Sequence, residues 1–82
     1  MKYDIPNGYE TIFEAQMEKG LREYGSNDML RFGSSWLINE AKSELVDGTV
    51  YLQAANKNNY NDNVAKAIDY LRKAMETLKE YK

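Results

Sequence analysis

The helical spacing of the apolar residues constrains this chain more than any other feature, because it recurs in three separate segments. In the C-terminal segment the central stripe is Val64, Ile68, Leu71, Met75 and Leu78, widened on one side by Ala67, Tyr70, Ala74 and Tyr81. A period near 3.6 residues indicates amphipathic α-helix, and no segment shows the alternation typical of a half-buried strand. The pattern therefore predicts an all-α protein.

Residues that cap or end helices divide the chain into three helices, at about 8–24, 35–55 and 61–81. The expected capping residues are Asn7 with Glu10, Gly25, Ser34 or Ser35, and Asn61 or Asp62. The stretch 25–33 is too short for an element of its own and is expected to form an ordered loop. We therefore expect a single domain over residues 1–82, a helical hairpin preceded by an N-terminal helix.

The second helix carries more apolar positions than one face can bury. Its main stripe is Leu37, Ile38, Ala41, Leu45, Gly48, Leu52 and Ala55. Val46 and Val50 lie away from this stripe, nearer the side of Trp36. A single core in a chain of 82 residues rarely supplies more than about 3–5 kcal/mol. We therefore expect a homo-oligomer that completes the helical bundle, with Trp36, Val46 and Val50 at an interface and Gly48 allowing a close helix crossing.

Composition excludes several classes of function. The chain has no Cys and no His, so it has no thiol nucleophile, no cysteine zinc site and no histidine base. A net charge of −2 gives no general attraction to nucleic-acid phosphates. No apolar run approaches the roughly 20 residues that span a bilayer, and the N-terminus lacks a signal-peptide core. A cytoplasmic protein that binds neither membrane nor generic nucleic acid is expected.

Acidic residues form one edge of the second helix. At helical spacing Glu40, Glu44, Asp47 and Tyr51 fall on one strip beside the apolar face. Hard carboxylate oxygens suit Mg²⁺ rather than zinc. The first helix adds further carboxylates at four-residue steps, and antiparallel packing of the two helices would bring Glu14 and Glu18 toward that edge. The alternative is that all of them are solvated boundary carboxylates, with Tyr51 a packed aromatic.

Part of the chain contains Leu21–Gly25, then Glu40, Glu44-Leu45-Val46-Asp47 and Tyr51-Leu52. This pattern resembles small phage-type relatives of the all-α nucleoside triphosphate pyrophosphohydrolases, the MazG-like group. The resemblance implies that Glu44 and Asp47 match the Glu-x-x-Asp half of a Mg²⁺ site that cleaves between the α- and β-phosphates. It also implies phosphate contacts from Arg22, Lys19 or Lys42, which are otherwise surface cations. The family's earlier Glu-x-x-Glu pair is absent, and the chain is short for the usual four-helix protomer.

Three hypotheses for function follow. The one we favour is a small oligomeric helical protein, such as a phage accessory or inhibitor protein, that binds a host protein or a small nucleotide without catalysis. The alternative is a Mg²⁺-dependent pyrophosphohydrolase of the MazG-like type, with magnesium its only expected cofactor. A third is an oligomer that sequesters a nucleotide by stacking it on tyrosines at a subunit boundary.

Overall fold

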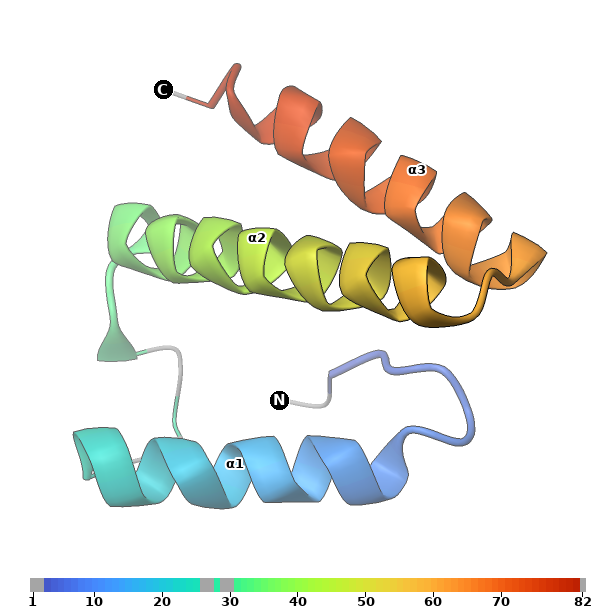
Figure 1. Cartoon of the computed structure of the whole chain (residues 1–82). Helices are drawn as coiled ribbons and strands as arrows, with labels where there is room; N and C mark the ends of the chain where they lie inside the picture. The colour runs from blue at the N-terminus through green and yellow to red at the C-terminus, as the bar shows by residue number, and fades with distance from the viewer. Residues whose placement is uncertain (1–2, 26–27, 29–30, 82) are drawn as a thin grey trace. The chain divides into compact units, whose positions relative to one another are not determined.

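The computed structural model describes residues 3–25, 28 and 31–81, and it is all-α (Figure 1). Its helices are α1 (Glu10–Tyr24), α2 (Ser34–Asn58) and α3 (Asp62–Leu78), and the described residues contain no strand. The predicted fold class of three helices is therefore confirmed. The chain divides into two compact units, Met1–Phe32 with α1 and Gly33–Lys82 with α2 and α3.

Helix α1 begins later than the sequence predicts, and its cap differs. Tyr9 occupies the N-cap position and its side chain makes no capping hydrogen bond, so the expected cap by Asn7 is wrong. The carboxylate of Glu10 instead accepts a hydrogen bond from the backbone N–H of Gly8, at 3.0 Å to the nearer oxygen. A glutamate in the first turn also interacts favourably with the positive end of the helix dipole.

Helix α1 ends as predicted. Gly25 has φ 73°, in the left-handed region that favours glycine, and its N–H donates to the carbonyl of Leu21 at 3.0 Å. Beyond it, the rings of Tyr24 and Phe32 meet edge to face with their centroids 6.0 Å apart. Residues 26–27 and 29–30, part of the expected ordered loop over 25–33, lie outside the described residues.

Helix α2 is one unbroken helix of 25 residues, longer at both ends than predicted. Gly33 is the N-cap, with extended backbone and a carbonyl that accepts from the N–H of Leu37 at 3.0 Å. The expected capping role of Ser34 or Ser35 is therefore wrong, because the helix has already begun at Ser34. At the other end the helix continues to Asn58, although asparagine is a weak helix former.

A short turn leads into α3, and here the predicted cap is confirmed. The Asn61 side-chain oxygen accepts from the N–H groups of Asn63 at 2.8 Å and Val64 at 3.1 Å. The Asn56 side chain in turn accepts from the N–H of Asn61 at 3.1 Å. These bonds satisfy two of the amides left unpaired at the start of a helix and tie the turn to the end of α2.

Helices α2 and α3 pack as an antiparallel hairpin, closest near the turn that joins them (Figure 1). We call their facing positions the hairpin seam: Ile38, Lys42, Leu45, Thr49, Leu52 and Asn56 on α2, and Val64, Ile68, Leu71, Met75 and Leu78 on α3. All of them are buried or half-buried, and their alternating spacing of four and three residues is that of a coiled coil. The predicted stripe of α3 is thereby confirmed.

On α2 the predicted stripe is confirmed at five positions, which are half-buried, and wrong at its two alanines: the five are Leu37, Ile38, Leu45, Gly48 and Leu52. Ala41 and Ala55 are exposed, whereas Lys42 and Asn56 are half-buried in the hairpin seam. Thr49 is 7% exposed, and no hydrophobic side chain among the described residues is buried. Its hydroxyl donates to the carbonyl of Leu45 at 2.7 Å, which satisfies it within its own helix. The hairpin therefore holds a narrow contact line rather than a filled core.

Candidate functional site

The acidic edge predicted from spacing is present on α2. Because the helix is continuous, Glu40, Glu44, Asp47 and Tyr51 share one side of it, and all four are exposed. Tyr51 is 74% exposed, so it is not packed within the α2–α3 hairpin. Over the described part of the chain, no group of three or more acidic side chains is placed to hold a metal ion.

The other predicted ligand residues are spread over both units. Glu14, Glu18 and Arg22 are exposed on α1, which belongs to the first unit. The approach of the two glutamates to the acidic edge of α2 stays a prediction, as does phosphate binding by Arg22. Lys42 is half-buried in the hairpin seam, where its aliphatic stem contributes packing.

A valine pair stands on the flank of α2, outside the hairpin seam. Val46 is 51% exposed and Val50, one turn later, is 58% exposed. Trp36, the third predicted interface residue, lies farther around the same helix and is 36% exposed. Residues four apart on a helix are neighbours on its surface, so the two valines form a continuous apolar ridge. We call Val46 and Val50 the valine ridge.

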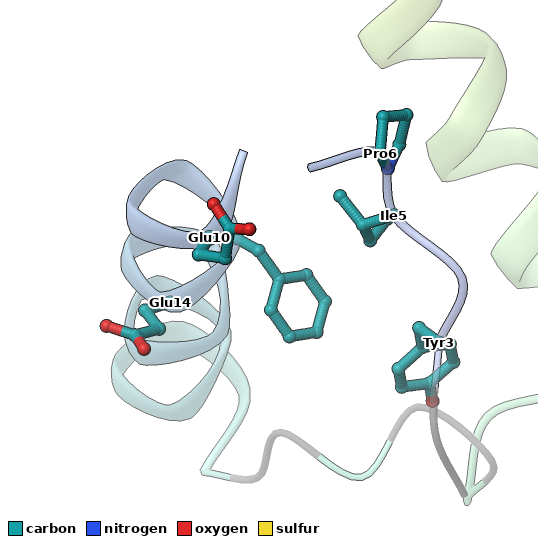
Figure 2. A pocket seen from close by; sticks show the side chains of 6 residues that line it. Tyr3, Ile5, Pro6, Glu10 and Glu14 are labelled. Atoms are coloured by element: carbon teal, nitrogen blue, oxygen red, sulfur yellow. The ribbon is translucent and has the colours of Figure 1, made fainter. Parts of the chain in front are cut away.

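The first unit contains a crevice that sequence reasoning missed. The N-terminal segment turns back beside α1, and Figure 2 shows Tyr3, Ile5 and Pro6 on one side with Glu10 and Glu14 on the helix. The space between them is about 260 Å³, and Phe13 completes its lining. The rings of Tyr3 and Phe13 lie 6.2 Å apart. The available signal was the group of apolar residues Tyr3, Ile5 and Pro6 before a helix whose first residues include Phe13.

The turn between α2 and α3 holds one perturbed ionisable group. Tyr60 is exposed, and its hydroxyl donates a hydrogen bond to the carboxylate of Asp62. This bond, together with the negative charge of Asp62, raises the pKa of Tyr60 above its usual value. The effect favours the neutral phenol, so this pair stabilises the turn rather than supplying a base.

Comparison with known proteins yields no relative. No family model, no curated protein and no solved structure matches the chain. The resemblance to the MazG-like group therefore stays a prediction from the sequence. Within the described residues, no helix is long and apolar enough to cross a membrane.

Proposed function

We propose that this chain is an oligomeric helical binding protein that engages a protein partner through the valine ridge, without catalysis. The observation that carries the proposal is the exposure of Val46 at 51% and Val50 at 58% in the middle of a long helix. β-Branched residues lose side-chain freedom in a helix and disfavour it slightly. Because neither valine is buried, neither recovers that cost within the chain.

Aromatic side chains on the same helix support a binding role. Protein interfaces are enriched in Tyr and Trp, which supply large contact areas at small entropic cost. Helix α2 carries Trp36, 36% exposed, on nearly the same side as Val50, whereas the exposed Tyr51 lies about 100° around the helix from Val50. The partner that fits such a surface is a protein that offers a matching apolar helix or groove.

The test is retention of a protein partner from a cell extract by the immobilised full chain, followed by titration of the recovered protein. Val50→Ala keeps the helix, because alanine is the better helix former. The substitution is expected to lower the affinity for the partner about tenfold if the valine is buried at the centre of the interface. Asp69→Ala, an exposed substitution elsewhere on the hairpin, is the matched control and should bind as the parent does. Equal affinity of the parent and Val50→Ala would contradict the proposal.

The pyrophosphohydrolase alternative depends on one specific observation, the exposed Glu44 and Asp47 on one edge of α2. It predicts pyrophosphate release from a nucleoside triphosphate with Mg²⁺, abolished by Glu44→Gln or Asp47→Asn. Binding without turnover, measured by calorimetry, would instead support nucleotide sequestration. Absence of both turnover and binding removes the two nucleotide hypotheses and leaves the protein-binding proposal in place.

A further inference from the structure

The turn that leads into α1 contains an asparagine followed by a glycine, the only such pair in the chain. Residues Pro6 to Tyr9 form this turn, in which the N–H of Tyr9 donates to the carbonyl of Pro6 at 3.3 Å. Gly8 stands at the third position with φ 97°, as a type II turn requires. Asn7 is exposed, and within the part of the chain that the structure describes no hydrogen bond holds its side-chain amide.

An asparagine in front of a glycine can react with its own backbone. The nitrogen of the glycine attacks Cγ of the asparagine, the new C–N bond closes a succinimide ring, and the bond from Cγ to the side-chain nitrogen breaks. Ammonia leaves with the proton that the backbone nitrogen has lost. Water then adds to either ring carbonyl and opens the ring to aspartate or to isoaspartate. Glycine favours the first step because it has no Cβ to obstruct the approach of the nitrogen.

Glu10 holds the nitrogen that would attack. The N–H of Gly8 donates to the carboxylate of Glu10, at 3.0 Å to one oxygen and 3.3 Å to the other. Ring closure requires this nitrogen to lose its proton, and a carboxylate beside it disfavours the resulting negative charge. The hydrogen bond also restrains the peptide plane between Asn7 and Gly8, which must rotate to bring the nitrogen to Cγ. Both effects slow the reaction.

We propose that the Asn7–Gly8 pair is a self-modification site, at which Asn7 deamidates through a succinimide with solvent water as the only co-reactant. Glu10 is a positioning residue that restrains the reaction through its hydrogen bond to Gly8. The modification needs no partner, and it is independent of the binding role proposed for the valine ridge.

The structure opposes the same chemistry at other positions. Asp47 also precedes a glycine, but both residues lie inside α2. Within a helix the N–H of Gly48 is bonded to the carbonyl four residues before it, and the backbone angles are fixed. The remaining asparagines precede residues that carry side chains, and Asn61 is held further by the two N–H groups that its oxygen accepts. Sequence and structure together therefore single out Asn7.

The isoaspartyl product changes the turn that shapes the crevice of the first unit. Isoaspartate carries the backbone through its side-chain carbons and so lengthens the chain within the turn. The bond from Tyr9 to the carbonyl of Pro6 closes this turn, which sets the N-terminal segment beside α1 (Figure 2). A longer turn shifts that segment and separates the rings of Tyr3 and Phe13, now 6.2 Å apart. Deamidation thereby acts as a slow, irreversible release of the segment from α1.

The experiment is incubation of the full chain at neutral pH, with circular dichroism to show that it stays folded. Peptide mapping by mass spectrometry measures the conversion of Asn7, and chromatography separates isoaspartate from aspartate. Asn7 is expected to convert while Asp47 and the other asparagines stay unchanged. Glu10→Ala should raise the rate at Asn7 about fivefold, the factor that one hydrogen bond of ordinary net strength contributes.

Two further variants separate the hydrogen bond from a general effect of charge on α1. Glu10→Gln keeps an acceptor for the N–H of Gly8 without the negative charge, so its rate should lie between those of the parent and Glu10→Ala. Glu14→Ala is the matched control, because Glu14 lines the same crevice one turn later and makes no bond to Gly8. Its rate should equal that of the parent, with the same helix content in all variants.

Three results would overturn parts of this proposal. If Asn7 stays intact in the folded parent and in Glu10→Ala, while the chain unfolded in denaturant converts, the fold closes the site. Equal rates in the parent and Glu10→Ala, or equal acceleration by Glu14→Ala, would remove the positioning role of Glu10. Nuclear Overhauser contacts between Tyr3 and Phe13 that persist in the isoaspartyl product would remove the release of the segment. None of these results bears on the partner affinity measured with Val50→Ala.

Discussion

Substitution of Gly48 by alanine tests whether the space beside this residue is as open as the hairpin indicates. Glycine within a helix destabilises it by about 0.8–1.0 kcal/mol relative to alanine. The nearest atom to an added Cβ is Cδ1 of Leu71 at 4.0 Å, an ordinary van der Waals distance. We therefore expect Gly48→Ala to raise the free energy of unfolding by about 1 kcal/mol, with no loss from steric overlap.

The assay is thermal and urea unfolding followed by circular dichroism at low micromolar concentration. For a domain of this size, a gain of 1 kcal/mol corresponds to a rise of about 4–8 °C in Tm. Ser43→Ala is the matched control, because Ser43 is exposed on the same helix and bonds only to the carbonyl of Asn39. It should give a smaller gain from helix propensity alone. A Gly48→Ala protein less stable than the parent under these conditions would refute the reasoning, because it would show a tighter contact at Gly48.

Two further predictions concern the turn between α2 and α3. Asn61→Ala removes the acceptor for the N–H groups of Asn63 and Val64. It should lower the free energy of unfolding by about 1 kcal/mol in urea titrations. An unchanged urea midpoint would mean that water caps the helix equally well. The pKa of Tyr60, measured by ultraviolet difference absorbance, should lie above 10, and Asp62→Asn should bring it down toward its usual value. Since the folded-state pKa is raised, the stabilisation is present at neutral pH and is lost as the pH rises through that pKa.

Helix α3 shows what local sequence determines well. Its stripe from Val64 to Leu78 is the only wide apolar face available to it, and Asn61 has the side chain that can accept from two amides at once. Both features depend on interactions within a few residues, so the pattern predicted them. Gly25 is similar, because the left-handed backbone that ends α1 favours glycine whatever lies around it.

Helix α2 shows what local sequence leaves open. The apolar spacing placed Ile38, Leu45 and Leu52 on the packed side correctly, together with Ala41 and Ala55, which are exposed. The hairpin instead half-buries Lys42 and Asn56, because the position of α3 decides which neighbouring residues are covered. The acidic edge followed from spacing within one helix, whereas any approach of carboxylates from α1 depends on tertiary packing, which spacing does not encode.

The polar residues in the hairpin seam suggest that the two sides of α2 have different roles, one setting helix alignment and the other supplying apolar burial. Lys42, Thr49 and Asn56 recur every seven residues, and polar groups at such positions hold helices in one alignment at a cost in stability. The hairpin seam therefore specifies how α2 and α3 align, while leaving most of the apolar burial to be gained elsewhere. If a second copy of the chain supplies that burial, as the proposed oligomer requires, folding and association are coupled, and Tm must rise with protein concentration by mass action.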